Sequence, residues 1–326
     1  MFKRLIAIIL GVLVVAVLSA LVSESQDREV LEIRTGAPLE IAASAEGKSN
    51  CGRPEQRIRA GDVIDAVDRF TRGDYLIQMR HKMVKLDVPP EYRPPPKPVK
   101  SSYLVVKRKG STIKRFDVGT YSPVGNSAAA GFFSLLGTGP KQLIVSQEDG
   151  PKTGVQWVAD FSKRFRVIFD GQKFRVGRES YDMTISDYDG DGVNEIVVPI
   201  TAFYGFENWR LYTGETPLPD IIFKYNPGQR EYLPANPEFK ECLLRNIETA
   251  DKSLRAMNKQ PALGRLMAVT LDYILVGEES RGWSFFDETC KLPDKSRIKD
   301  DMQRVLNEHP VYRFLFQKSR LKKVNS

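Results

Sequence analysis

Histidine, cysteine and the common nucleotide-binding motifs are scarce or missing in this chain. Its 326 residues include two histidines, His81 and His309, and neither lies in a Ser/His/Asp or Cys/His pattern that would suggest nucleophilic catalysis. Cys-x-x-Cys spacing, a glycine-rich phosphate loop and a dinucleotide fingerprint are also absent from the sequence. Because active sites assemble from residues distant in sequence, these absences lower the expectation of an enzyme without excluding one.

The three cysteines are too few for a disulfide framework. They allow one disulfide and one spare thiol, in three alternative pairings. Cys242 and Cys290 fall in the same C-terminal segment, and we predict that these two pair. Cys51 lies in a polar stretch and could link two chains. The alternative is three unpaired thiols, of which buried ones would be packing residues.

Basic charge is in excess, but no nucleic-acid motif accompanies it. The formal net charge is +8 and the pI is about 9.2. Much of the excess lies in Lys107–Lys109 and in the C-terminal tail between Lys318 and Lys323. No aromatic and basic residues suited to base stacking surround these runs, so we expect no nucleic-acid partner. A solvated surface is the simpler interpretation, and attraction to lipid headgroups is the alternative.

The N-terminus has the pattern of a membrane segment. Lys3 and Arg4 precede Leu5–Val22, which is eighteen residues without a charge. A helix of that length spans about 27 Å, close to the hydrocarbon thickness of a bilayer. Cleaved signal peptides have a shorter apolar core and an Ala-x-Ala-like site, so we favour an uncleaved anchor. The preceding cations place the N-terminus in the cytoplasm and the bulk of the chain outside it. If the segment is cleaved, the protein is secreted or periplasmic.

Residues Asp187–Glu195 read Asp-Tyr-Asp-Gly-Asp-Gly-Val-Asn-Glu, and the apolar run Ile196–Val198 follows at once. Carboxylates stand at positions 1, 3, 5 and 9, and glycines at positions 4 and 6 let the backbone curl. A hard cation such as Ca²⁺ takes six to eight oxygen ligands, which this spacing can supply. We predict a Ca²⁺ site with the side chains of four acidic residues and one backbone carbonyl as ligands: Asp187, Asp189, Asp191, Glu195 and the carbonyl of Val193.

Three other interpretations of this loop are weaker. An EF-hand needs a glutamate at position 12, where this chain has Val198. An ordinary Asp-Gly turn would leave four carboxylates repelling one another. A catalytic carboxylate pair requires two groups with different pKa values, whereas these four would share one ion.

The loop belongs to an internal repeat with a shift of 53 residues. Gly137–Val145 aligns with Gly190–Val198, with glycine on glycine and an apolar triplet after each pair. Two further echoes are Trp157 with Trp209, and 169–174 with 226–232. A third partial copy, Tyr103–Phe116, lies upstream. In the first full copy all four carboxylates are replaced, by Ser134, Leu136, Thr138 and Gln142.

These residues resemble the FG-GAP or VCBS repeat proteins, whose blades carry an Asp-x-Asp-Gly-Asp-Gly-x-x-Asp/Glu loop followed by an Ile-Val-Val-like strand. The resemblance covers roughly residues 100–236, and its specific part is Asp187–Val198. It implies Ca²⁺ between the strands of β-propeller blades, in modules used for adhesion or scaffolding outside the cell. The chain shows two blades and a half, whereas a closed propeller has four to eight.

The segments together predict an α+β multidomain protein. We expect a membrane or signal segment over 1–25, and a stalk with a small packing segment ending in the proline-rich spacer Pro89–Pro98 over 26–98. Within the stalk, 61–88 reads as either a helix or a strand pair. An antiparallel β-repeat domain then covers 99–236, and a helical domain with apolar residues at helical spacing covers 237–326. Asn236 and Pro237 should cap its first helix.

The expected function is that of an exported or membrane-anchored, non-enzymatic binding or scaffold protein with one structural Ca²⁺ site. Its partner would be a protein or another ligand of the cell envelope, and its N-terminal helix would hold it to the membrane. The alternative is a cell-envelope hydrolase that uses the carboxylate or metal cluster. Aromatic residues after the loop either line a ligand groove or pack between strands: Phe203, Tyr204, Phe206 and Trp209.

Overall fold

The structure is a computed structural model that describes residues 70–84, 99–120, 129–137, 139–148, 154–176, 183–203, 206, 209, 211 and 215–316. The predicted membrane segment, the proline-rich spacer, Cys51 and the basic tail lie outside these residues. Within them, no helix has both the length and the apolar character needed to cross a bilayer.

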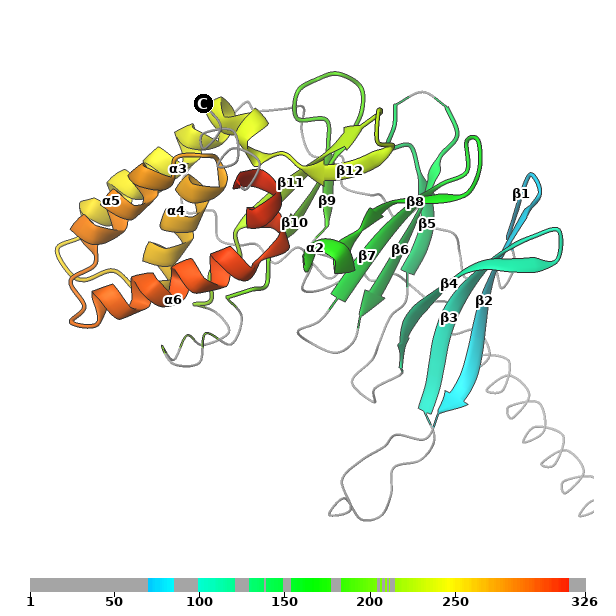
Figure 1. The fold of residues 1–326 in the computed structure, drawn as a ribbon, viewed down its shortest axis with the longest axis horizontal. Helices are drawn as coiled ribbons and strands as arrows, with labels where there is room; N and C mark the ends of the chain where they lie inside the picture. Colours follow the sequence, from blue (N-terminus) through cyan, green and yellow to red (C-terminus); the bar gives the residue numbers. More distant parts are fainter. Residues whose placement is uncertain are drawn as a thin grey trace, which may run out of the picture.

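The described strands form three antiparallel sheets, each a meander of four strands (Figure 1). The first sheet contains β1 (Phe70–Arg72), β2 (Tyr75–Val84), β3 (Val99–Arg108) and β4 (Ser111–Thr120). The second contains β5 (Ala129–Phe133), β6 (Gln142–Glu148), β7 (Gly154–Asp160) and β8 (Arg166–Asp170), followed by the short helix α2 (Gly171–Phe174). The third, in the order β12-β11-β10-β9, contains β9 (Thr184–Ser186), β10 (Glu195–Pro199), β11 (Asp220–Asn226) and β12 (Glu231–Pro234).

The sheets stand in a row, and apolar side chains fill the space between neighbours (Figure 1). Between the first and second sheets, the rings of Phe116 and Trp157 lie 5.5 Å apart. Between the second and third, the rings of Phe169 and Phe223 lie 5.0 Å apart in an edge-to-face arrangement. The described strands do not close into a propeller ring. Chain order therefore gives a row of sheets with two outer faces.

The β region begins earlier than position 99. Strands β1 and β2 lie in the segment assigned to the stalk, and β2 pairs with β3 from Tyr75↔Arg108 to Val84↔Val99. The open choice for this segment is thus decided in favour of a strand pair. Burial alternates along β2, with Tyr75 and Ile77 buried against the second sheet. This period of two is the strand signal that the helical spacing of Leu76 and Met79 obscured.

One of the repeat echoes is confirmed and two are wrong. The 53-residue shift places Gln142, the first residue of β6, on Glu195, the first residue of β10. Trp157 lies in β7, whereas Trp209 lies in the connection between β10 and β11. Residues 169–174 end β8 and form α2, whereas 226–232 form the turn between β11 and β12. The connection after the repeated strand differs in length between the sheets, so the shift holds only up to that strand.

Residues 310–316 are helical, and before them four helices follow the third sheet, in the segment predicted to be helical. They are α3 (Lys240–Arg255), α4 (Leu263–Leu275), α5 (Glu279–Thr289) and α6 (Lys295–Glu308). A 3-10 helix, η3 (Asn236–Phe239), precedes them, and Asn236 does not cap α3. Its amide instead accepts from Ile222 N at 3.0 Å and donates to Asp220 O at 2.9 Å, which ties the helical domain to β11.

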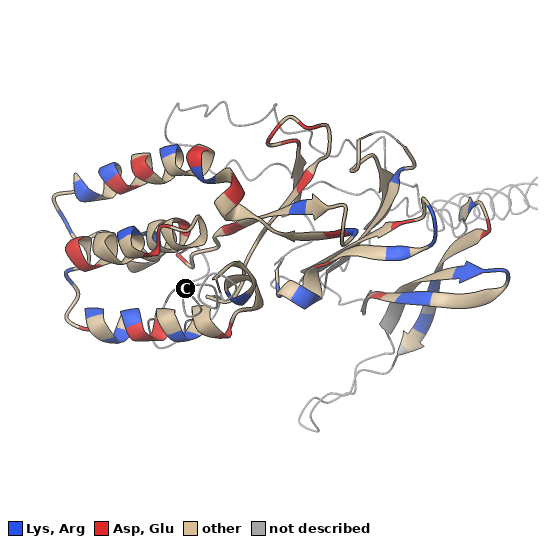
Figure 2. Ribbon diagram, turned by 45° about the horizontal axis from the view of Figure 1, so that its top comes forward, with Lys and Arg blue, Asp and Glu red and all other residues tan. Residues whose placement is uncertain are grey.

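Residues of η3 and the start of α3 cover the outer face of the third sheet. Val197 and Ile222 form a small apolar cluster with Ala235 and Phe239. All five residues of β10 are buried, because one face meets the second sheet and the other meets this cluster. Helix surfaces elsewhere carry basic and acidic residues in mixture (Figure 2), as expected for amphipathic helices with one buried stripe.

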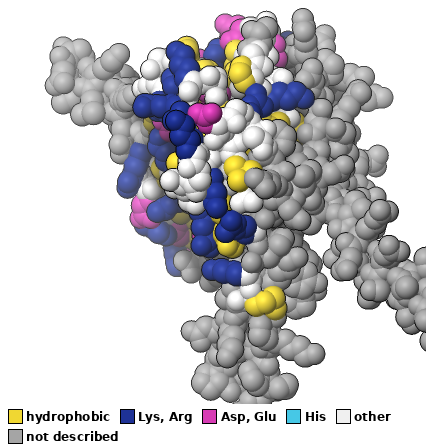
Figure 3. Space-filling model, turned by 90° about the vertical axis from the view of Figure 1, so that its right-hand side faces the viewer, with side chains coloured by type: hydrophobic (Ala, Val, Ile, Leu, Met, Phe, Trp, Pro, Cys, Tyr) yellow, Lys and Arg dark blue, Asp and Glu magenta, His cyan; other side chains and the backbone are white. Residues whose placement is uncertain are grey.

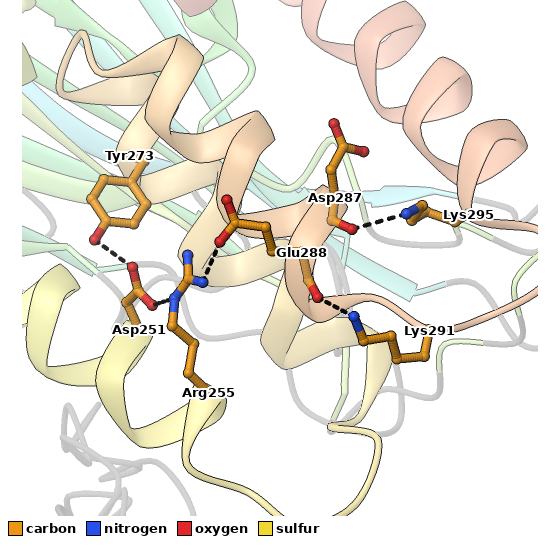
Figure 4. Close-up of polar contacts among 7 residues, drawn as sticks. All are labelled: Asp251, Arg255, Tyr273, Asp287, Glu288, Lys291 and Lys295. Atoms are coloured by element: carbon orange, nitrogen blue, oxygen red, sulfur yellow. Dashed lines mark hydrogen bonds and ion pairs between the residues drawn. The ribbon is translucent and has the colours of Figure 1, made fainter.

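A buried carboxylate joins three of the helices (Figure 4). Asp251 on α3 is 7% exposed; it accepts from the Tyr273 hydroxyl on α4 at 2.9 Å and pairs with Arg255. Arg255 also pairs with Glu288 on α5 at 2.5 Å. These partners satisfy a charge that would otherwise be costly to bury. Lys291 and Lys295 donate to the carbonyls of Glu288 and Asp287 near the end of α5, where a helix attracts cations.

The predicted disulfide between Cys242 and Cys290 is wrong. Cys290, at the C-terminal end of α5, is a free thiol that is 1% exposed, and it belongs to the main apolar core. It behaves as a packing residue. Cys242 on α3 is disulfide-bonded, and its partner lies outside the described residues. Proximity in sequence was a poor guide, because α4 and α5 separate the two positions.

The α4–α5 contact offers a test of the helical core. A Cβ at Gly282 would lie 2.8 Å from Thr270 O and 3.1 Å from Tyr273 Cβ. We expect Gly282→Ala to lower the free energy of unfolding by ~1–3 kcal/mol through overpacking, although alanine is the better helix former. Urea denaturation of the full chain measures this. Ser280→Ala, on the exposed side of α5, should change stability by less than ~0.5 kcal/mol. Equal effects of the two substitutions would contradict the close packing.

Candidate metal centre

The acidic loop connects the last residue of β9, Ser186, to the first residue of β10, Glu195. Gly190 and Gly192 have φ angles of 76° and 85°, a left-handed conformation that favours glycine. The loop also folds back on its own amides. Gly192 N donates to Asp187 Oδ2 at 3.1 Å, and Val193 N donates to Asp191 Oδ1 at 2.7 Å. Alternate carboxylates therefore turn toward the centre of the loop, as the spacing predicts.

Glu195 is the buried member of the group. Its side chain is 0% exposed, and its Oε2 accepts from Tyr188 N at 2.7 Å. Neither its Oε1 nor Asp187 Oδ1 has a hydrogen-bond partner among the described residues, although both atoms are buried. Burial, together with the nearby charges of Asp189 and Asp191, raises the pKa of Glu195 to about 7. Two buried carboxylate oxygens without donors are what a bound cation would satisfy.

Asp187, Asp189 and Glu195 form a group that could hold a metal ion. One carboxylate oxygen from each lies within 4.8 Å of the others. Of the predicted ligands, the structure thus brings three together. Asp191 is exposed and stands outside the group, with one oxygen taken by Val193 N. The carbonyl of Val193 remains a predicted ligand that the grouping of side chains does not test.

Lys224 is a member of the site that the sequence pattern did not reveal. From β11 its ammonium pairs with Asp189 Oδ2, and it also lies 5.8 Å from the ring centroid of Phe239. The hydrogen bond to Asp189 raises the pKa of Lys224, so this side chain stays charged. A cation at the loop would have to share Asp189 with this ammonium. Alternation along β11 predicts the face of the sheet on which Lys224 lies. It does not predict that β11 lies beside the acidic loop.

The loop also contacts the second sheet. Asn194 N donates to Leu135 O at 2.7 Å, and its side-chain amide donates to Ser134 O at 3.1 Å. A Cβ at Gly137 would lie 2.5 Å from Gly192 O, so only glycine permits this approach. Tyr232 on β12 donates to Asn194 O at 2.9 Å. The candidate metal loop is therefore a contact between two sheets as well as a turn within one.

The corresponding loop of the second sheet has the same side-chain to backbone hydrogen bond, made by a neutral residue. Gln142 stands where Glu195 stands in the repeat, and its Oε1 accepts from Leu135 N at 2.9 Å. Leu135 is itself the counterpart of Tyr188, whose amide donates to Glu195. Gln142 is 2% exposed. Both loops are thus closed by the first side chain of the next strand, a neutral amide in one sheet and a carboxylate in the other.

An open pocket of about 420 Å³ lies beside the loop. Asp189 is the one member of the carboxylate group that reaches it, and η3 and the start of α3 supply most of the remaining wall, including Glu238, Lys240 and Glu241. Asp187 and Glu195 do not line it. Of the aromatic residues after the loop, Tyr204 lies outside the described residues, and the other three do not line the pocket: Phe203 and Phe206 are buried in the main core, and Trp209 Nε1 donates to Asp301 at 3.0 Å.

His309 takes no part in the carboxylate group. It is 3% exposed after the end of α6, and burial lowers its pKa to about 4, so it is neutral at physiological pH.

Comparison of the chain with protein-family models, with curated proteins and with solved structures found no match.

Replacing Glu195 with the residue of the sister loop tests the buried charge. The folded pKa of Glu195, about 7, lies above its ordinary value of 4.5. The proton held by the folded chain stabilises it below about pH 4.5, and that contribution is lost as the pH rises through about 7. In chelator, Glu195→Gln should therefore raise stability by up to ~3 kcal/mol at pH 8 and remove this pH dependence.

Denaturant unfolding between pH 4.5 and 8 measures both effects. Glu231→Gln is the control, because Glu231 is partly exposed and pairs with Lys173 at the surface. Its effect should stay within ~0.5 kcal/mol across the same range. A wild-type chain whose stability in chelator is flat between pH 4.5 and 7 would contradict the burial of a strained carboxylate at this position.

Proposed function

We propose that the chain is an exported or membrane-anchored, non-enzymatic binding or scaffold protein whose acidic loop holds one structural Ca²⁺ ion. The observation that carries this proposal is the group of Asp187, Asp189 and Glu195 with two buried oxygens that no donor satisfies. Three carboxylates at one point repel one another, and a divalent cation would remove both the repulsion and the unmet hydrogen-bonding capacity.

The chemistry of the donors favours Ca²⁺ among the common metals. The described group offers carboxylate oxygens alone, without the histidine or cysteine ligands that zinc prefers. The carboxylates come from a curled loop, and Ca²⁺ tolerates such irregular geometry better than Mg²⁺, which requires near-octahedral order. Further oxygens would come from Asp191, from the Val193 carbonyl and from water. An extracellular site of this kind need bind only at ~10⁻⁴–10⁻³ M.

The position of the loop gives the ion a mechanical role. Holding Asp187 and Glu195 would fix the segment between them, and that segment carries the Asn194 contacts to Ser134 and Leu135. The ion would therefore stabilise the junction between the second and third sheets as well as its own loop. This role agrees with the resemblance to FG-GAP and VCBS repeats, which we retain as part of the proposal. It is supported by Asp187–Val198 and by the 53-residue shift that aligns Gln142 at the start of β6 with Glu195 at the start of β10.

Two features support a location outside the cytoplasm. Lys3 and Arg4 precede the uncharged run Leu5–Val22, which suits a single-pass anchor or an export signal. Cys242 is disulfide-bonded, and disulfides persist mainly in oxidising compartments. On this basis the sheets and helices face the cell envelope or the exterior. The partner would be a protein or another envelope ligand.

A cell-envelope hydrolase is the second candidate, favoured by one observation. Asp189 lines the open pocket together with Glu238 and Glu241, so an ion on Asp189 could meet a substrate there. The structural role is better supported, because Asp187 and Glu195 do not line the pocket and the described residues that line it include no histidine, serine or threonine. Turnover of ester or phosphate substrates that depends on Ca²⁺ and is lost in Glu238→Gln would favour the hydrolase.

Calcium titration of the full chain in detergent tests the proposed site. We expect saturable calorimetric binding and a melting temperature that rises with Ca²⁺, since a ligand at ten times its Kd adds about 1.4 kcal/mol. Asp187→Asn and Glu195→Gln should abolish both signals. Lys224→Gln should tighten binding by roughly threefold to tenfold, because it frees Asp189 from a competing cation.

Asp300→Asn supplies the matched control, since Asp300 is an exposed carboxylate on α6 outside the group. Its titration curve should overlay that of the wild-type chain. Absence of binding up to several millimolar, the range of the weakest extracellular sites, would reduce the loop to a turn and remove the main support for the family resemblance.

A further inference from the structure

Basic charge is concentrated on the first sheet. Its described residues carry nine lysines and arginines and two aspartates. The formal net charge of the whole chain is +8, so this sheet holds most of the excess. The basic residues are Arg72, Arg80, Lys82, Lys100, Lys107, Arg108, Lys109, Lys114 and Arg115, and the acidic ones are Asp74 and Asp117.

The alternation of the strands separates these charges from the core. Tyr75 and Ile77 on β2 and Leu104 and Val106 on β3 face the second sheet. The intervening positions therefore point to the opposite, outer face. Four basic side chains share this face, Arg80, Lys82, Lys107 and Arg115, and Asp117 on the same face pairs with Arg115 at 2.5 Å. Lys109 stands beside them in the β3–β4 turn, with a φ of 49°.

The first sheet stands at the end of the row opposite the helices, and no described helix or strand packs on its outer face (Figure 1). Val105 on this face is nevertheless only 4% exposed. Viewed from that end, the described surface shows many Lys and Arg side chains, with Asp and Glu at fewer places (Figure 3). The helices at the other end carry both signs together (Figure 2). The charge asymmetry is therefore a property of one surface of the molecule.

The same sheet exposes apolar side chains. Ile113 on β4 is 43% exposed, whereas Met83, 66% exposed, lies on the same side of β2 as Tyr75 and Ile77, away from these cations. Tyr103, by contrast, is covered by the guanidinium of Arg115, which lies 4.1 Å from its ring centroid. Cations flanked by exposed aliphatic groups suit a membrane interface. Tyr103 is the one aromatic ring that the described strands place on the outer face, and it is engaged, so these strands offer no platform for stacking bases.

We propose that the outer face of the first sheet, with the β3–β4 turn, docks on anionic phospholipid headgroups of the membrane that holds the N-terminal segment. This inference rests on the proposed anchoring, because residues 5–22 would keep the sheet near that surface. Headgroup phosphates attract Lys and Arg within a Debye length, about 8–10 Å at physiological salt. Docking would orient the row of sheets so that the metal loop and the helices face away from the lipid.

Lysine labelling of the full chain tests the proposal. The chain is reconstituted in vesicles of phosphatidylcholine alone or with phosphatidylglycerol, and acetylation rates are read by mass spectrometry. We expect Lys82, Lys107 and Lys109 to react several-fold more slowly on the anionic vesicles, with the difference removed in 1 M salt. Lys252 and Lys259, exposed on α3 and after it, should react equally on both. A tether alone would slow the first three lysines equally on both lipids.

Matched variants separate docking from proximity. Replacing Arg80, Lys82 and Lys107 together with Gln should abolish the anionic-specific protection of Lys109, since each lost cation weakens attraction about fivefold. Replacing Lys252, Lys259 and Arg265 with Gln removes the same charge from the helical end, and it should leave that protection intact. Circular dichroism and the calcium titration show that both variants fold.

Flotation in high salt with phosphatidylcholine vesicles reads the anchor separately, so its failure is distinguishable from failure of docking. If the chain does not float, it is labelled in solution with and without anionic vesicles, and the same lysines decide the outcome. Equal reactivity of Lys107 and Lys109 in both lipids would overturn the proposal. Protection by duplex RNA at physiological salt, with none from anionic vesicles, would overturn it in favour of a nucleic-acid partner.

Discussion

The start of β10 depends on how the Glu195 carboxylate is satisfied. This side chain is fully buried, one oxygen accepts the amide of Tyr188, and the other has no donor among the described residues. Burial raises the pKa of Glu195 to about 7. Near neutral pH, either a proton or a bound cation can neutralise this carboxylate. The loop that ends at this carboxylate also holds the second sheet through Asn194. The charge state of Glu195 and the contact between the second and third sheets are therefore linked through this loop.

The sister loop shows that the geometry does not require the charge. Gln142 closes its loop through the amide of Leu135, as Glu195 does through the amide of Tyr188. A neutral amide is enough for the turn, and it carries no desolvation cost of an ion. The carboxylate at Glu195 is therefore not needed for the turn, and together with Asp187 and Asp189 it forms a group that could hold a metal ion. The difference between the two sheets is the clearest physical reason to assign a site to one of them.

The row of sheets gives the molecule two unlike ends. At one end η3 and the start of α3 bury the apolar outer face of β10 and β11, and Asp251 with its partners joins α3, α4 and α5. At the other end the first sheet leaves a basic face without a described cover. In an open row of sheets, each terminal face must be either covered or soluble, because the row does not close into a barrel or ring. One face is covered with helices and the other is charged.

The sequence alone determined the features with a short physical range. These are the four helices with their apolar stripes, the acidic loop with its glycines, and the repeat that aligns Gln142 with Glu195. The helical spacing of 3.6 residues and the alternation of ligands are local patterns, so they can be recognised in the sequence without knowing the fold. Tertiary structure decided the rest. It placed β2 beside β3 across the proline-rich segment, left Cys290 unpaired in the core, and brought Lys224 to Asp189 from a neighbouring strand. Each of these depends on which segments become neighbours in space, and pairing between distant segments leaves no periodic trace in either one.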